Sequence, residues 1–133
     1  MHIKDKHGNT LCLIIKKREM SEGKVFYTHD AEEFQFASFR LGKDEVIDRH
    51  YHFQNTREVK FTSEAIIVYE GRIQLDIYDL AKEFIQSEIL IEGDVAILSS
   101  GGHALKLLEK SHFIEVKQGP YNENTDKERF WFD

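Results

Sequence analysis

Apolar and polar residues alternate along most of this chain in short runs, and Gly, Asn and Asp residues separate the runs. Alternation places every second side chain on the same face of a pleated strand, so the pattern predicts half-buried β-strands rather than helices. The predicted strands, in chain order, are Leu11–Lys17, Phe34–Arg40, Glu45–His52, Phe61–Tyr69, Arg72–Tyr78, Phe84–Ile91, Val95–Leu98, His103–Leu108 and Phe113–Lys117. Such a succession is typical of an antiparallel β-sandwich or β-barrel, and we expect an all-β fold.

The chain is expected to form one domain. Its 133 residues fall within the usual size of a single domain, and no Pro- or Ser-rich linker, low-complexity tract or internal repeat divides them. We expect N-terminal strands over about residues 1–41, a barrel core over about 42–119 and a C-terminal tail over about 120–133.

Two features of the sequence leave more apolar surface than one small barrel can hide. The tail after Pro120 is polar except for the adjacent aromatic residues Phe130, Trp131 and Phe132, which we expect to dock on the barrel or on a neighbouring copy. The stretch Ala65–Tyr69 is apolar at consecutive positions, and therefore on both faces of its predicted strand. The sequence thus predicts a homodimer.

Charge and composition narrow the classes of partner. Lys and Arg number 18 against 24 Asp and Glu, and the formal net charge of −6 opposes binding to nucleic acid. No apolar run approaches the roughly 20 residues needed to cross a bilayer, and the first residues show no secretory signal, so we expect no membrane partner and a cytoplasmic location. The single cysteine, Cys12, is interpreted as a buried apolar residue.

A pair of histidines and a glutamate form the first candidate site. His50 and His52 stand at i and i+2, so on a strand their imidazoles point to the same face, close enough to share one ion. Glu64 shares its predicted strand face with Ile66 and Val68, and a carboxylate on that face points to the core. A buried carboxylate must be protonated, ion-paired or bound to a cation.

His103 is the third candidate. It follows Gly101 and Gly102, and it shares a strand face with Leu105 and Leu107. Glycines at that point let the backbone bend sharply and bring the histidine close to another strand.

These residues resemble the motifs of the cupin superfamily. The first cupin motif is a Gly, then His-x-His, then a Glu followed by six residues and a Gly; the second is a Gly-led strand ending at a His. In this chain the corresponding residues, in order, are Gly42, His50, His52, Glu64, Gly71, Gly93 and His103.

The resemblance implies a jelly-roll barrel, or double-stranded β-helix, that holds one divalent metal ion on His50, His52, Glu64 and His103. Three imidazoles and one carboxylate suit Fe, Mn, Ni or Zn, and the sequence does not choose among them. An octahedral ion would keep two positions for water, substrate or oxygen. The segment Phe53–Ser63 must loop out for Glu64 to reach the two histidines.

The C-terminal residues carry a narrower resemblance. The stretch Ile114–Tyr121, followed by Asp126-Lys127 and Arg129-Phe130, is similar to the ending of small cupin metalloproteins associated with bacterial surface-polysaccharide and sugar-nucleotide pathways. This resemblance implies a carbohydrate-like substrate class and no particular reaction.

The leading hypothesis is a metalloenzyme that acts on a small polar molecule, in which the ion serves as a Lewis acid for isomerisation or oxidation. The candidate anchors for anionic groups of a substrate are Arg57, Lys117, Tyr121 and Arg129. His112 alternates with Ile114 and Val116, so we expect it in packing rather than in the metal site.

Two alternatives stay open at this point. The first is a non-catalytic module in which the barrel captures a small ligand and any metal is structural. The second is a metal-free sugar-nucleotide isomerase that uses His50 and His52 as an acid/base pair, which would leave Glu64 and His103 without a role.

Overall fold

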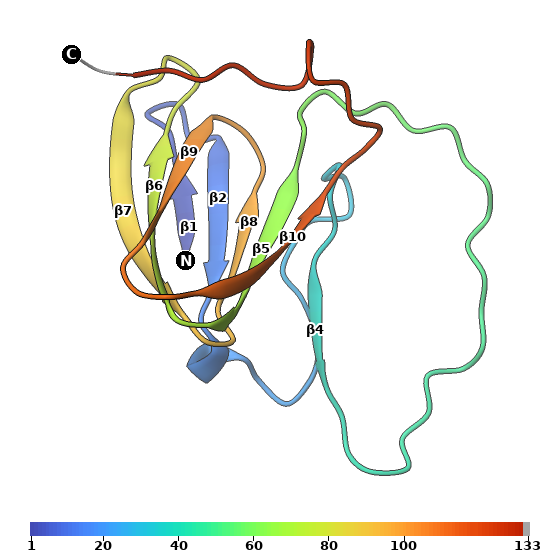
Figure 1. The fold of residues 1–133 in the computed structure, drawn as a ribbon. Helices are drawn as coiled ribbons and strands as arrows, with labels where there is room; N and C mark the ends of the chain where they lie inside the picture. The colour runs from blue at the N-terminus through green and yellow to red at the C-terminus, as the bar shows by residue number, and fades with distance from the viewer. Residues whose placement is uncertain (132–133) are drawn as a thin grey trace. The chain divides into compact units, whose positions relative to one another are not determined.

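Strands and one short 3-10 helix make up the regular structure of residues 1–131, the part of the chain that the computed structural model describes (Figure 1). In chain order they are β1 (His2–Lys4), β2 (Thr10–Ile15), η1 (Lys17–Glu19), β3 (Gly23–Phe26), β4 (Ala37–Arg40), β5 (Glu64–Glu70), β6 (Arg72–Tyr78), β7 (Phe84–Ile91), β8 (Val95–Leu98), β9 (Gly102–Leu107) and β10 (His112–Lys117). The predicted all-β class is confirmed. No helix within these residues has the length and apolar character that a membrane span requires.

The elements belong to two units. The first, which we call the sandwich unit, contains Met1–Glu19 and the chain from Phe61 onward; the second, the arm unit, is Met20–Lys60. The sandwich unit holds a sheet of order β1-β2-β8-β5-β10 and a sheet of order β7-β6-β9, and the arm unit holds the β3–β4 hairpin. All the described pairings are antiparallel, and none of the described sheets closes into a barrel.

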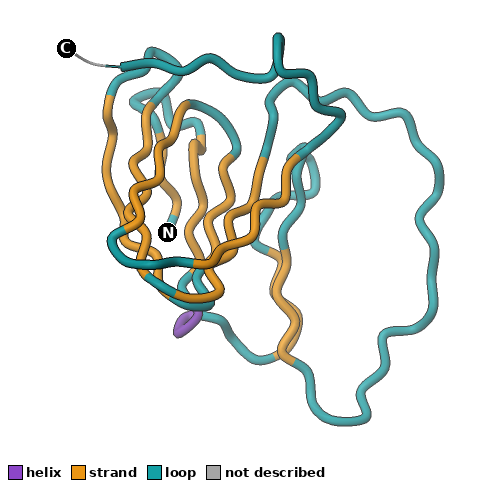
Figure 2. The backbone as a smooth tube through the Cα atoms, viewed as in Figure 1, coloured by secondary structure: helices purple, strands orange, loops and turns teal. Residues whose placement is uncertain are grey.

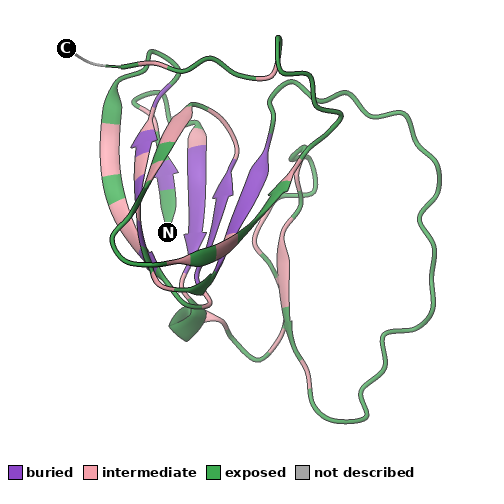
Figure 3. Ribbon diagram, in the orientation of Figure 1, coloured by how far each residue is buried: buried purple, intermediate pink, exposed green. Residues whose placement is uncertain are grey.

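The core of the sandwich unit lies where apolar residues of both its sheets meet. On β6 every second residue is buried, namely Ile73, Leu75 and Ile77, which matches the alternation of the sequence. These side chains share one cluster with residues of β5 and β2 such as Ile66 and Ile14. Figure 3 shows the buried residues gathered on these strands. Burying each such side chain stabilises the fold by about 1.5–3 kcal/mol, so this interior joins the two sheets.

The larger sheet is apolar on both faces in its middle. Cys12 and Ile14 of β2 point into the shared core, whereas Leu13 and Ile15 point to the opposite face and are also buried. Burial raises the pKa of the Cys12 thiol to about 12, so this side chain behaves as the apolar residue that the sequence predicts.

The arm unit differs because none of its residues is buried. Its two-stranded hairpin pairs Gly23 with Arg40 and Phe26 with Ala37, and such a hairpin is only marginally stable by itself. Beyond β4 the chain continues as a long stretch without strands, visible in Figure 2 between the last strand of the hairpin and β5. The strand predicted over Glu45–His52 is therefore wrong, because no neighbouring strand supplies ladder hydrogen bonds to these residues.

The remaining strand predictions agree with the structure to different degrees. Three of the predicted ranges coincide with β6, β7 and β8, and four others overlap β2, β5, β9 and β10 with ends that differ. The predicted strand Phe34–Arg40 is shortened to β4. Two short strands, β1 and β3, were not predicted because they contain few apolar residues that alternate.

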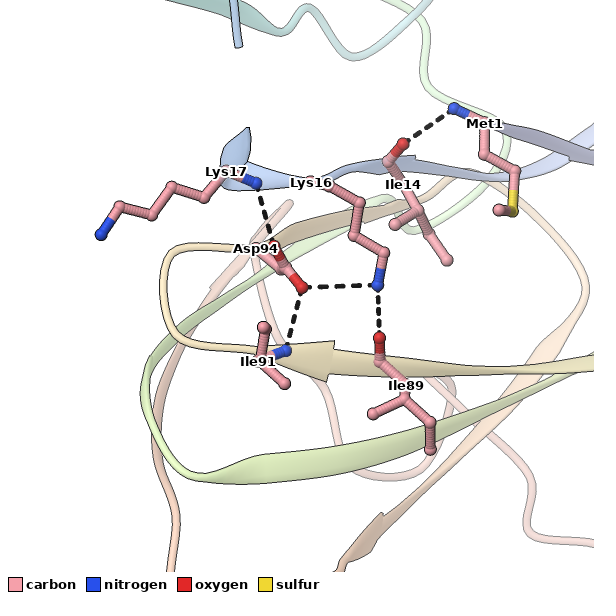
Figure 4. A network of polar contacts seen from close by, with 7 residues as sticks. All are labelled: Met1, Ile14, Lys16, Lys17, Ile89, Ile91 and Asp94. Atoms are coloured by element: carbon pink, nitrogen blue, oxygen red, sulfur yellow. Dashed lines mark hydrogen bonds and ion pairs between the residues drawn. The ribbon is translucent and has the colours of Figure 1, made fainter. Parts of the chain in front are cut away.

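Asp94, which precedes β8, is the best-satisfied buried charge of the sandwich unit (Figure 4). Its carboxylate accepts hydrogen bonds from the backbone N–H groups of Lys17 and Ile91, each at 2.9 Å. The Lys16 ammonium lies 3.4 Å from the same carboxylate and also donates to the carbonyl of Ile89. Because Lys16 and Asp94 come from opposite halves of the chain, this network ties β2 to the turn between β7 and β8.

Replacement of Asp94 tests how much this network contributes. Asp94→Ala leaves the half-buried Lys16 ammonium and two backbone N–H groups without this acceptor, so we expect a loss of about 3 kcal/mol in the free energy of unfolding, measured with urea. Glu128→Ala is the matched control, because the ion pair of Glu128 with Lys82 is exposed, and it should cost less than about 0.5 kcal/mol. Equal effects of the two substitutions would contradict a stabilising role for the network.

Candidate functional site

Glu64 and His103 face each other between the two sheets of the sandwich unit. Glu64 is the first residue of β5, and His103 is the second residue of β9, a strand of the other sheet. The Glu64 Oε1 atom lies 3.1 Å from His103 Nε2, and the Glu64 side chain is only 11% exposed. Glu64 is buried together with Ile66 and Val68, so the predicted inward orientation of this carboxylate is confirmed.

Two glycines allow β9 to place His103 there. Gly101 has φ +75°, and a Cβ atom at this position would lie 2.3 Å from the carbonyl oxygen of Tyr78. At Gly102 a Cβ atom would lie 2.8 Å from the ring of Phe130. The sharp bend and the close approach predicted for the glycine pair are both present. A larger residue is excluded at Gly101 by the positive φ and the nearby backbone, and at Gly102 by the Phe130 ring.

The two oxygens of Glu64 differ in their surroundings. Oε1 accepts from His103, whereas Oε2 is buried and has no hydrogen-bond partner. The hydrogen bond from His103, assisted by the positive charge of Lys117, lowers the pKa of Glu64 although burial opposes ionisation. The structure therefore holds an ionised carboxylate with one oxygen unsatisfied, and that atom is the strongest indication of a missing proton or cation.

Glu115 of β10 is a site residue that sequence reasoning missed. The neighbouring carboxyl group of Glu64, together with partial burial, raises the pKa of Glu115. Two neighbouring carboxyl groups repel each other when both are ionised, so the proton of Glu115 is held more tightly. The alternation of charged and apolar residues on β10 does not show which face is covered, but the antiparallel register sets Lys117 opposite Glu64 and so brings Glu115 to the same face.

Two of the predicted anchor residues lie beside this cluster. The Lys117 Nζ atom is 4.0 Å from Glu115 Oε2 and 4.8 Å from the centre of the Tyr121 ring. The other two, Arg57 in the arm unit and Arg129 near the C-terminus, are exposed. Lys117 and Tyr121 thus form a cationic and aromatic border to the Glu64–His103 pair.

His50 and His52 belong to the arm unit and are exposed. Their ring centres are 5.4 Å apart, and the rings of Tyr51 and Phe53 lie at the same separation from each other. Contacts between residues two apart indicate an extended backbone, so the expected same-face arrangement of the two histidines is present although no strand forms. The Nδ1–H of His50 donates to the carbonyl of Asp48 at 2.8 Å, which leaves Nε2 free to ligate.

His112 lies on the outer face of β10, away from the pair. Its ring stacks on Tyr69 at a distance of 5.3 Å between ring centres, and both residues are exposed. This contact is a packing contact, as expected for His112.

The donor set of the pair suits a divalent ion only in part. Glu64 Oε2 is free to coordinate, and a metal ion would replace the proton that His103 Nε2 shares with Glu64 Oε1. Within residues 1–131, however, no three His, Cys, Asp or Glu side chains are grouped so that they could hold a metal ion. Without a metal, the same pair is a carboxylate–imidazole dyad of the kind used in acid–base catalysis.

We compared the chain with known protein families, curated proteins and solved structures. Neither a protein-family model, nor a curated protein, nor a solved structure matches the chain.

The carboxyl pair makes a prediction about pH. Because the pKa of Glu115 is raised above 4.5 in the folded protein, its contribution to stability is present at low pH and is lost as pH rises through the raised value. Glu115→Gln keeps an N–H donor toward Glu64 at every pH. In EDTA, urea unfolding should show similar stability for wild type and variant near pH 4, on the order of the unfolded pKa, and a more stable variant near pH 7.

Glu70→Gln, at the exposed other end of β5, is the matched control. The difference in stability between this variant and the wild type should be the same near pH 4 and near pH 7. If Glu115→Gln shifted the free energy of unfolding equally at both pH values, Glu64 would not raise the pKa of Glu115.

Proposed function

We propose that this chain is a cupin-type protein that binds one divalent metal ion on His50, His52, Glu64 and His103. The observation that carries the proposal is the buried, unpaired Oε2 atom of Glu64, with His103 Nε2 on the other oxygen of the same carboxylate. A divalent cation bound at Oε2 would compensate the desolvated charge. Fe, Mn, Ni and Zn all accept this combination of ligands.

The geometry of the arm unit is compatible with two further ligands. His50 and His52 lie side by side on an extended and exposed stretch, which has the conformation that a strand needs before it pairs.

The border residues indicate the kind of ligand that would bind beside the ion. Lys117 offers a cation and Tyr121 an aromatic face, a combination that fits a small polar molecule with anionic and sugar-like parts. When bound, the metal would supply Lewis-acid polarisation of a carbonyl or of neighbouring oxygens. Lys117 would orient the ligand, and Glu115 would hold or release a proton next to Glu64.

Isomerisation and oxidation are both compatible with this arrangement, and so is ligand binding without turnover. We also propose a cytoplasmic location, with which a chain that has a single cysteine is compatible.

A second candidate function rests on the Glu64–His103 hydrogen bond itself. As a metal-free dyad, Glu64 would orient His103, and His103 would transfer a proton to or from a bound ligand. This version differs from an acid/base pair of His50 and His52, because both of its members already touch in the sandwich unit.

We further propose that the protein is a homodimer. Tyr69, Ile114 and Val116 are 56%, 39% and 47% exposed and lie on the outer face of the adjacent strands β5 and β10. They continue the face on which Leu13 and Ile15 are buried. A second copy would cover this edge of the sheet.

Elemental analysis of protein purified without a histidine tag tests the metal proposal. We expect near-stoichiometric Fe, Mn, Ni or Zn in the wild type, and loss of metal in His50→Ala and Glu64→Gln, because each removes one of four ligands. His112→Ala should keep its metal, since His112 stacks on Tyr69.

Two other outcomes would change the proposal. Protein that stays metal-free after addition of all four metals would exclude the metal site and leave the dyad, which predicts that Glu64→Gln lowers turnover of a sugar nucleotide without altering metal content. If ligands bind and none is converted, with and without oxygen, the chain is a binding module.

Light scattering tests the homodimer. The wild type should have the mass of a dimer at micromolar concentration, and Val116→Lys should shift it toward monomer because a charge would be buried at the interface. Lys106→Glu on β9 is a control that should keep the dimer. A wild-type monomer at every concentration would reject the proposal.

A further inference from the structure

The segment Tyr121–Phe130 crosses the end of the sandwich unit that holds Glu64 and His103. It leaves β10 next to Ser63, whose carbonyl accepts from the backbone N–H of Gln118 at 2.9 Å. It then contacts residues from both sheets, and all of these contacts lie within the sandwich unit. Figure 1 shows this last part of the chain, coloured red, running past the ends of the strands.

The first contacts are polar and exposed. Thr62 donates to Asp126 at 3.3 Å, and Thr62 stands two residues before Glu64. Lys82, in the turn between β6 and β7, pairs with Glu128 at 3.1 Å. Lys82 has φ +67°, a conformation that is uncommon for a residue with a side chain and that needs support from its surroundings. Exposed polar contacts of this kind contribute little stability on their own.

The last contact is apolar and close. The Phe130 ring packs edge-to-face on Tyr78 at 5.2 Å between ring centres and lies over Gly102. A Cβ atom at Gly102 would be 2.8 and 2.9 Å from two ring carbons of Phe130. Gly102 does not have a positive φ, so an alanine there is excluded only by the ring and not by the backbone. The sequence therefore keeps a glycine at the position before His103 so that this ring can sit on the backbone.

We propose that Tyr121–Phe130 is a strap, and that Phe130 is a positioning residue that holds the start of β9 so that His103 stays against Glu64. Release of Phe130 from Gly102 frees the backbone beside His103, breaks its hydrogen bond to Glu64 and opens this end of the sandwich unit. The strap thus controls how readily the pair is reached from solvent. This inference rests on the proposed function in one respect, namely that the Glu64–His103 pair is the functional site.

Acylation of histidines by diethyl pyrocarbonate, followed by peptide mass spectrometry, tests the strap in metal-free protein. Phe130→Ala and Gly102→Ala should each speed modification of His103 roughly fivefold, because each removes the same contact and raises the population of the open form. Phe130→Leu, which retains an apolar side chain, should restore most of the protection. His29, exposed in the arm unit, provides an internal standard whose rate should not change.

Trp131→Ala is the matched control, since Trp131 is 80% exposed and should leave His103 as slow as in the wild type. The double variant Gly102→Ala/Phe130→Ala should match the single variants, because both act on one contact. An unchanged His103 rate in Phe130→Ala, an equal increase in Trp131→Ala, or a double variant that multiplies the two single effects would each overturn the strap. None of these readings requires metal, so the metal proposal succeeds or fails separately.

Discussion

The apolar interior shared by the two sheets of the sandwich unit is the constraint on which the other features depend. Residues such as Ile66 on β5 and Leu75 on β6 fill this interior, and the alternation of the sequence supplies them. Any polar group that enters the same space must find partners inside the protein, because water is excluded. A buried charge whose polar atoms all have hydrogen-bond partners is part of the fold, whereas a buried charge with an unpartnered atom indicates a place where a ligand could bind.

Two buried carboxylates near opposite ends of β8 illustrate this difference. Asp94 precedes β8 and receives two backbone N–H groups and an ammonium, so its charge is fully used in joining distant parts of the chain. Glu64 pairs with Leu98 at the other end of β8, and one of its oxygens has no partner. A network without an unsatisfied atom stabilises the fold, whereas an unsatisfied atom beside a histidine can bind something else. This contrast, more than any motif, directs attention to Glu64.

The residues around the Glu64–His103 pair come from three separate parts of the chain. His103 arrives from the other sheet, Glu115 and Lys117 from β10, and Phe130 reaches the backbone beside His103 from the C-terminal segment. Their separation along the chain explains why Glu115 and Phe130 were not recognised as parts of one site. A charged residue that alternates with apolar ones has the same pattern whether its face is exposed or lies opposite a buried carboxylate. The register between β5 and β10 decides between these two cases.

Local pattern in the sequence was sufficient for the all-β class, for most strands, for the inward orientation of Glu64 and for the bend that brings His103 inward. These properties depend on residues one to four positions apart, and strand alternation and glycine conformation act at that range. Alternation could not show that Glu45–His52 lacks a strand partner, because pairing depends on another part of the chain. Only the tertiary structure placed His103 on Glu64, left Oε2 unsatisfied, added Glu115 and seated Phe130 on Gly102. Each of these contacts joins residues far apart in sequence, and only packing around a common core brings such residues within a few ångströms of one another.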